Sequence, residues 1–333
     1  MRKKVLFVRP KASRFTEIDR RIFEKYYETE TIDFGFLKED PLKFLINHLR
    51  VIDGVISSDI VVIWFADFHA LSAILFSKIS GKKTVLIVGG YEVARIPELG
   101  YGGALNFKRR LITKFVVKNS TKVIAVSAFS KSEILKCFPS AQPEVIYNCV
   151  DTDFFVPALR KENIVLTVSV ARDRNVALKG IATFVSAASL VKEAKFVIVG
   201  FTEGELRGQM NEPLPGNVEC TGYLDGQSLL EWYQRAKVYC QLSRYESFGV
   251  ALAEAMSCCC VPVVTREGAL PEVVGDTGFY VPYGDVEATA SAIREALQSD
   301  KGRLARQRVI EKFSVVEREK KLLGLIDATL DEH

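Results

Sequence analysis

The stretch Val238-Tyr-Cys-Gln-Leu-Ser-Arg-Tyr-Glu-Ser-Phe-Gly-Val-Ala-Leu-Ala-Glu-Ala-Met-Ser-Cys-Cys-Cys-Val-Pro-Val-Val-Thr265 decides the fold. Its apolar runs at 238–242 and 261–264 have the length of strands. The chain turns between them, and a helix is expected to start near Phe248-Gly249. Two carboxylates belong to this strand–helix–strand segment: Glu246 lies in the loop and Glu254 inside the helix.

This segment has the properties of a phosphate site. A glycine-containing loop before a helix presents backbone N–H groups and the positive end of the helix dipole. Gly249 lets the backbone approach a ligand closely. Glu254 can accept hydrogen bonds from two ribose hydroxyls, as carboxylates do in dinucleotide folds. The stretch therefore predicts a sugar-nucleotide site, and an amphipathic helix with solvated acids remains the alternative on spacing alone.

The composition is typical of a soluble globular protein and not of a disordered one. The chain has 333 residues, 48% hydrophobic and 26% charged, which is enough for two domains of ordinary size. Its apolar runs fall short of the roughly 18–20 residues that a membrane helix needs. The start, Met-Arg-Lys-Lys-Val-Leu-Phe-Val, is interpreted as a first strand, not as a signal peptide. Seven cysteines, an odd number, suit a reducing cytoplasm.

Charge is distributed unevenly along the chain. Residues 1–150 contain 24 basic and 15 acidic side chains, a net charge of +9, whereas the remainder has a net charge of −5. A basic half beside an acidic half predicts a negatively charged partner for the first half.

Strand-length apolar runs alternate with helix-length amphipathic segments, which predicts α/β units with parallel sheets. Expected strands are 5–8, 60–64, 84–88, 122–126, 144–147, 164–170, 195–199, 218–220, 238–242 and 261–264. The turn-rich segment 148–157 separates two series of such units.

The segment 238–265 and the residues that follow it resemble a motif of a known family. Glu246-x7-Glu254 with Ser-Phe-Gly between them, followed by Glu-Ala-Met-Ser-Cys and by Gly268 to Asp285, is similar to the donor motif of retaining glycosyltransferases of family four. The resemblance implies a GT-B fold: two Rossmann-like βαβ domains face each other across a cleft, and the C-terminal helix returns to the first domain. Residues 1–155 with about 314–333 would form the acceptor-side domain, and 156–313 the nucleotide-sugar-binding domain.

The resemblance also implies roles for single residues. Arg172 and Lys179, in a segment similar to the family's Gly-Arg-Leu…Lys-Gly signature, would contact the donor diphosphate, although solvated surface charges are the alternative. Glu246 would hold sugar hydroxyls and Glu254 the ribose. Further donor contacts are expected from Ser247, Phe248, Gly249, Val250, Tyr223 and Leu224.

The first half departs from the family pattern. The turn after the first strand has no glycine pair, and Gly89 stands where the family usually has a histidine. Gly89 and Gly90 would allow the backbone to approach a sugar. His69 follows the strand 60–64 and is a candidate catalytic residue, with a helix-capping or packing role as the alternative.

The implied function is transfer of a sugar from a nucleoside diphosphate sugar to an acceptor, with retention at the anomeric carbon. Neither a metal nor another cofactor is expected, and Asp151-Thr-Asp153 is interpreted as part of the linker and not as a metal site. Two alternatives are a catalytically weakened GT-B protein that only binds nucleotide sugars, and a GT-B phosphorylase or epimerase.

Residues 104–119 form a basic segment with apolar residues at helical spacing. Such a helix can lie on an anionic membrane surface, whereas a domain helix with a solvated face is the alternative. Expected partners are the nucleotide-sugar donor, a glycan or lipid-linked acceptor and an anionic membrane surface, but no nucleic acid. We expect a cytoplasmic protein, with peripheral association on the inner face of the cell membrane as a hypothesis.

Overall fold

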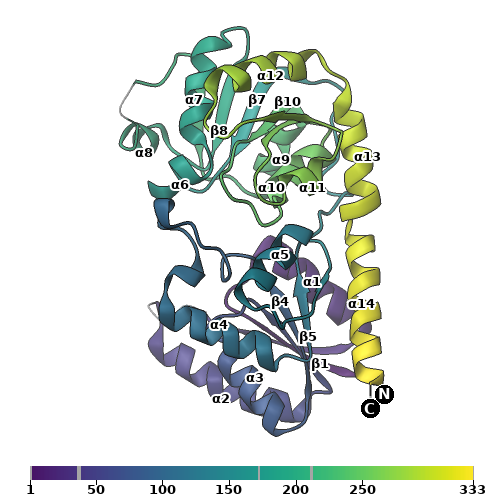
Figure 1. The fold of residues 1–333 in the computed structure, drawn as a ribbon. Coiled ribbons are helices and arrows are strands. Elements are labelled where there is room, and N and C mark those ends of the chain that lie inside the picture. The colour runs from purple at the N-terminus through teal and green to yellow at the C-terminus, as the bar shows by residue number, and fades with distance from the viewer. Residues whose placement is uncertain (1, 36–38, 172, 211–212, 333) are drawn as a thin grey trace. The chain divides into compact units, whose positions relative to one another are not determined.

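The computed structural model describes residues 2–35, 39–171, 173–210 and 213–332. The chain divides into two compact units, residues 1–148 with 316–333 and residues 149–315. Each unit contains a six-stranded parallel sheet flanked by helices (Figure 1). The predicted α/β class with two Rossmann-like units is confirmed. The boundary predicted at 155/156 falls later in the same linker than the division at 148/149.

The first sheet has the strand order β2-β1-β3-β4-β5-β6. The strands are β1 (Lys4–Arg9), β2 (Glu28–Asp33), β3 (Ile60–Trp64), β4 (Lys83–Val88), β5 (Lys122–Ala125) and β6 (Pro143–Val145). The helices are α1 (Arg14–Tyr26), α2 (Pro41–Ser57), α3 (Ala70–Ile79), η1 (Pro97–Leu99), η2 (Gly103–Leu105), α4 (Phe107–Asn119), α5 (Ala128–Cys137) and α14 (Val315–Asp331). Helices α2, α3 and α4 lie on one side of the sheet, and α1 and α14 lie on the other (Figure 1).

The second sheet has the order β12-β11-β10-β7-β8-β9. Its strands are β7 (Glu162–Val168), β8 (Lys195–Val199), β9 (Val218–Gly222), β10 (Ala236–Gln241), β11 (Val261–Thr265) and β12 (Phe279–Val281). The helices are α6 (Asp173–Leu178), α7 (Ile181–Leu190), α8 (Glu203–Arg207), α9 (Gly226–Arg235), α10 (Val250–Ser257), α11 (Leu270–Val274), α12 (Val286–Gln298) and α13 (Lys301–Phe313).

Central strands of both sheets are buried on both faces, which explains their continuous apolar sequences. β3 and β11 are buried at every residue. Each unit has its own hydrophobic core between sheet and helices. The carboxyl ends of all strands in a sheet meet at one edge, which is where α/β folds place ligands.

Two strands were missed by the sequence analysis. β2 alternates glutamate, threonine and isoleucine at the edge of its sheet, and most of its side chains reach solvent, so it lacks a run of apolar residues. β12 has three residues and also lies at an edge. Among the described residues, no helix is long and apolar enough to cross a membrane.

Candidate active site

The candidate donor site lies at the carboxyl end of β10, in the second unit. β10 ends at Gln241, and a loop leads from it to α10, where Gly249 occupies the N-cap position with φ +95°. The expected strand–loop–helix arrangement is therefore present, and Glu254 lies inside α10 as predicted.

Glu246 forms an ion pair with Lys179. The Lys179 Nζ lies 2.6 Å from Glu246 Oε2, and both side chains are mostly shielded from solvent. Lys179 directly follows α6, so this contact joins the loop between α6 and α7 to the loop that follows β10. The sequence predicted both residues for the donor site, and the structure brings them together.

Backbone contacts hold these two loops in place. The Arg244 N–H donates to the carbonyl oxygen of Leu178 (2.8 Å), and the Ala269 N–H donates to that of Glu246 (2.8 Å). Gly268, at φ +63°, packs so closely that a Cβ there would lie 2.3 Å from the Glu246 carbonyl oxygen. The position of Glu246 is thus set by the loop backbone.

A buried hydrogen-bond chain reaches Glu246 from the strand. The Tyr239 hydroxyl donates to Gln241 Oε1 (3.0 Å), and Gln241 Nε2 donates to Ser243 Oγ (2.7 Å) and to Glu246 Oε2 (3.3 Å). Burial raises the pKa of Tyr239 far above its ordinary value, so its hydroxyl stays protonated. The sequence analysis missed Gln241 and Tyr239, although positions 239, 241 and 243 share one face of an extended segment.

Glu254 is almost completely buried, with 3% of its surface exposed. Its Oε2 accepts a hydrogen bond from the Tyr233 hydroxyl (3.1 Å), which α9 supplies. A carboxylate in such a position needs hydrogen-bond donors, because an unpaired buried charge is costly. Tyr233 was also missed by the sequence analysis.

The remaining predicted donor contacts lie at the same edge of the sheet. Phe248 is buried against Phe313, with ring centroids 5.4 Å apart, so its side chain belongs to the core. Ser247 and Val250 are partly exposed beside Gly249. Tyr223 is 72% exposed and, with Leu224, follows β9, which is an edge strand three places from β10. Arg172 lies outside the described residues.

The predicted residues of the first unit have internal partners. His69 is buried, its Nε2–H donates to the carbonyl oxygen of Trp64 (2.7 Å), and its ring contacts Phe34. Burial lowers the pKa of His69 below its ordinary value, which favours the neutral ring. These contacts match the packing alternative; the catalytic assignment stays a prediction.

Gly89 and Gly90 direct their N–H groups at the carboxylate of Glu92 (3.1 and 2.8 Å). Glu92 is buried, and burial raises its pKa, while hydrogen bonds from the backbone oppose the shift. A Cβ at Gly89 would lie 2.2 Å from the Phe65 ring. The structure thus supplies a packing reason for Gly89, and the sugar contact stays a prediction.

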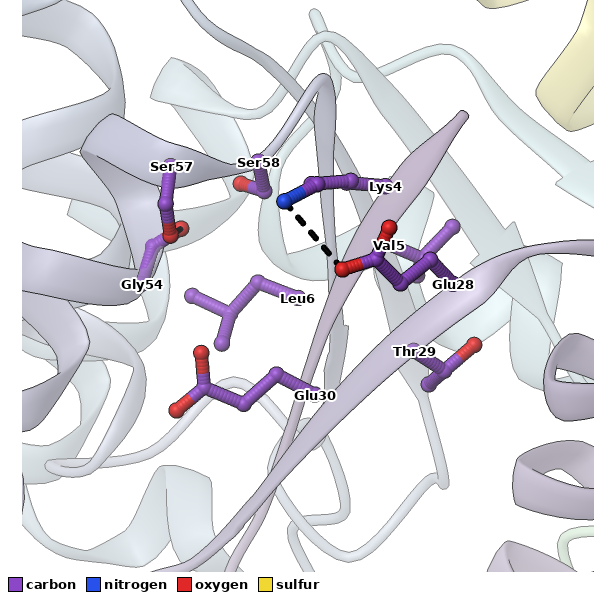
Figure 2. Close-up of a pocket in the computed structure, with 9 residues that line it drawn as sticks. All are labelled: Lys4, Val5, Leu6, Glu28, Thr29, Glu30, Gly54, Ser57 and Ser58. Atoms are coloured by element: carbon purple, nitrogen blue, oxygen red, sulfur yellow. Dashed lines mark hydrogen bonds and ion pairs between the residues drawn. The ribbon is translucent and has the colours of Figure 1, made fainter. Parts of the chain in front are cut away.

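A small pocket of about 130 Å³ lies elsewhere in the first unit (Figure 2). Lys4 and Glu28, which start β1 and β2, form an ion pair at its rim (3.1 Å). It therefore lies at the amino ends of the strands, opposite the edge where such folds bind ligands, and none of the predicted site residues lines it.

No group of three or more potential metal ligands is clustered within the described part of the chain. Asp151, in the predicted linker, instead accepts hydrogen bonds from the N–H groups of Asp153 and Phe154 (3.2 and 3.0 Å), as in a turn.

Two family models match the chain. The model described as "Glycosyltransferase Family 4" matches residues 5–154, and the model described as "Glycosyl transferases group 1" matches residues 162–299. Together with the two Rossmann-like units and the Glu246–Lys179 site, they define a glycosyltransferase of the GT-B fold. The chain belongs to glycosyltransferase family four.

Individual relatives are distant. The chain is 25% identical over 204 residues to the O-antigen chain mannosyltransferase B of Escherichia coli. This alignment covers 54% of this chain and 52% of the relative. It is 29% identical over 282 residues to the N-acetyl-alpha-D-glucosaminyl L-malate synthase of Bacillus anthracis, covering 77% and 71%. The chain thus spans about half the length of the first relative.

Among solved structures, the fold resembles the Anabaena protein HepE, crystallised in complex with UDP. The TM-score is 0.77 at 16% identity, and the alignment covers 98% of this chain and all of HepE.

Proposed function

We propose that the protein transfers a sugar from a nucleoside diphosphate sugar to a glycan or lipid-linked acceptor, with retention at the anomeric carbon and without a metal. The observation that carries this proposal is the Lys179–Glu246 ion pair at the carboxyl end of β10, with Glu254 buried in the adjacent helix. One cation and two carboxylates are thus contributed by the loops and the helix next to the carboxyl end of β10.

Each group has a distinct task. The leaving nucleoside diphosphate gains negative charge in the transition state, and preorganised cations and N–H groups stabilise such charge. Lys179 and the first turn of α10 supply these groups in the described structure, and Arg172 is expected to add a second cation. Glu246 would bind hydroxyls of the transferred sugar, and Glu254 would bind the ribose.

The ion pair is compatible with donor binding. A lysine ammonium group has three N–H donors, so Lys179 can keep its contact with Glu246 while it binds a phosphate oxygen. In this arrangement Glu246 also positions Lys179. Retention requires no protein nucleophile if the leaving phosphate accepts the acceptor proton on the face where the acceptor attacks.

The donor is tested first. Thermal shift with UDP, GDP and ADP identifies the base, and the corresponding nucleotide sugars are then assayed for transfer and slow hydrolysis, with the product anomer assigned by NMR. Activity should survive EDTA. An absolute requirement for Mn²⁺ or Mg²⁺, or an inverted product, would contradict the mechanism, and binding without turnover would favour a protein that only binds nucleotide sugars.

Lys179→Ala should lower turnover by at least ~100-fold, the scale for removing one preorganised charge stabiliser. Lys237→Ala is the matched control, because Lys237 belongs to the same unit and only approaches Asp300 at 3.8 Å. Equal losses in both variants would exclude a specific role for Lys179.

The acceptor side of the proposal includes an anionic membrane surface. α4 carries five basic and no acidic side chains. Peripheral association on the inner face of the cell membrane would bring a lipid-linked acceptor to the enzyme.

A further inference from the structure

Helix α2 exposes a stripe of aliphatic side chains. Leu42, Leu45, Ile46, Leu49 and Ile56 are 68%, 61%, 46%, 67% and 64% exposed. At 3.6 residues per turn these five positions fall within about 100° of the helix circumference. The stripe therefore follows one face of α2, and the exposed side chain of Asp53 lies within the same arc, between Leu49 and Ile56.

This stripe is separate from the face of α2 that packs on the core. Phe44, Val51 and Val55 are buried against the sheet. The helix is thus apolar on two faces, one of which the domain does not use. Contiguous apolar surfaces of this kind usually mark an interaction site.

The neighbouring helices extend the apolar surface. α3 packs between α2 and α4, and the three helices lie side by side (Figure 1). Further exposed apolar side chains on α3 and α4 are Leu75, Ile79, Phe107, Leu111 and Phe115. A groove of about 440 Å³ between the helices is lined mainly by apolar side chains, among them Leu71, Leu75, Phe76 and Phe115.

The same three helices are strongly basic. They contain eight basic side chains and one acidic side chain, Asp53. Exposed members are Lys43, Arg50, Lys78, Lys108, Arg110, Lys114 and Lys118. Arg109 differs from them, because it is partly shielded and paired with Asp67 (3.2 Å).

We infer that this face, formed by α2, α3 and α4, docks on an anionic lipid bilayer, with the α2 stripe inserted at the boundary of headgroups and acyl chains. Exposed aliphatic residues beside basic ones are what an interfacial helix needs. A second copy of the chain fits poorly, because two such basic faces would repel each other. The inference rests on the proposed lipid-linked acceptor and names its partner surface.

The charge and the stripe make separable contributions. Basic residues attract the surface from a distance and are screened by salt. The aliphatic stripe gains only on insertion, and its contribution persists at higher salt. Binding should therefore fall with added salt but need both features.

Co-sedimentation of the full chain with vesicles tests the inference. The vesicles are pure phosphatidylcholine, or phosphatidylcholine with about 30% phosphatidylglycerol to supply the negative headgroup charge. The test variant is Leu45→Glu/Leu49→Glu. The matched control is Leu159→Glu/Leu304→Glu, which adds the same charge at two exposed leucines of the second unit, 105% and 60% exposed.

Wild type and the matched control should bind the anionic vesicles and should not bind the neutral ones. The variant Leu45→Glu/Leu49→Glu should bind the anionic vesicles at least about tenfold more weakly than wild type. Wild type that stays in the supernatant with anionic vesicles, or equal binding by both double variants, would overturn the inference. Thermal unfolding of each variant checks that the first unit is intact.

Tryptophan fluorescence tests directly whether the α2 stripe enters the bilayer. In Leu49→Trp the emission of the new indole should shift to the blue with anionic vesicles and be quenched by lipids brominated on the acyl chains, whereas Leu304→Trp should show neither change.

Light scattering tests whether a second copy of the chain, and not a membrane, covers this face. A wild-type dimer that Leu45→Glu/Leu49→Glu converts to a monomer would overturn membrane docking in favour of a second copy. The thermal shift caused by the nucleotide should be equal in wild type and all variants. If wild type shows no such shift, the result counts against the donor site and not against the docking face.

Discussion

Glu254 is almost completely buried, and the Tyr233 hydroxyl donates a hydrogen bond to its carboxyl group. If this carboxylate binds the ribose, Glu254→Gln should weaken binding of the free nucleoside diphosphate by about 1.5–3 kcal/mol, the range for hydrogen bonds to charged groups. Calorimetric titration measures the change. Tyr233→Phe, which keeps the carboxylate, should cost less, and equal affinities of wild type and Glu254→Gln would disprove the ribose contact.

Gln241 connects Tyr239 to Glu246 and should act as a positioning residue. In Gln241→Leu, Glu246 loses a donor and the Tyr239 hydroxyl loses its acceptor. We expect turnover to fall roughly tenfold, equivalent to about 1.4 kcal/mol, with a much smaller change in nucleotide affinity. Steady-state kinetics and titration separate the two effects. A purely structural role would instead lower the melting temperature and leave turnover per folded molecule unchanged.

Because His69 is buried, we predict that the stability of the protein depends on pH. Burial lowers its folded pKa below the ordinary value of 6.5. The hydrogen bond to the Trp64 carbonyl and the charge of Asp67 partly oppose this shift in pKa, whereas His48 adds to it. The unfolded chain therefore binds the proton more readily, so the free energy of unfolding should fall as the pH drops below about 6.5. His69→Gln, whose amide can still donate to Trp64, should show a shallower fall in urea titrations at pH 7.5, 6.0 and 5.0. Parallel curves would contradict this origin.

At the scale of elements, the loops around Glu246 depend on glycines at positive φ. Gly268→Ala must place a methyl group 2.3 Å from a carbonyl oxygen at φ +63°. Strain of about 1–3 kcal/mol is expected from the backbone alone, and the clash should add to it and displace Glu246. Urea unfolding and turnover should both fall.

Gly284→Ala is the matched control for this strain. Gly284 also has a positive φ, +82°, but no atom lies within 4 Å of its added Cβ. It should lose stability through backbone strain and keep its turnover. If both variants lose turnover equally, close packing at Gly268 is not what positions Glu246.

At the scale of the whole molecule, the C-terminal helix α14 is fastened to the first unit by a buried ion pair. Arg318 contacts both oxygens of Asp19 (2.6 and 2.7 Å), and both side chains are 2% exposed or less. Asp19 also accepts a hydrogen bond from the Trp64 indole (2.7 Å). The pair links helices that are almost 300 residues apart in the chain.

Arg318→Met should therefore destabilise the protein by about 3–5 kcal/mol, because it leaves Asp19 buried without its cation. Denaturant unfolding measures this loss. Arg318→Met/Asp19→Asn should recover part of it, since the amide still accepts from Trp64 and carries no charge. Lys25→Met, which removes an exposed partner of Glu319 on the same helix, should change stability far less. A loss no larger than that of Lys25→Met would show that the buried pair contributes little.

The sequence by itself determined the α/β class, the family and the Glu246–Glu254 segment, because these depend on local signals: apolar runs of strand length, a glycine before a helix and a motif within 28 residues. It also identified Lys179, which lies 67 residues from its partner, but only through the resemblance to a family. Edge strands such as β2 were not predicted from the sequence, because a half-exposed strand has no continuous apolar run.

Tertiary structure alone decided which groups surround the candidate residues. The burial of His69, the donation from Tyr233 to Glu254 and the chain from Tyr239 through Gln241 to Glu246 all depend on contacts across the fold. The same holds for α2: its sequence shows apolar residues on most of the helix surface, and only packing separates the core face from the exposed stripe. Burial is a property of the assembled layers, so no local pattern contains it.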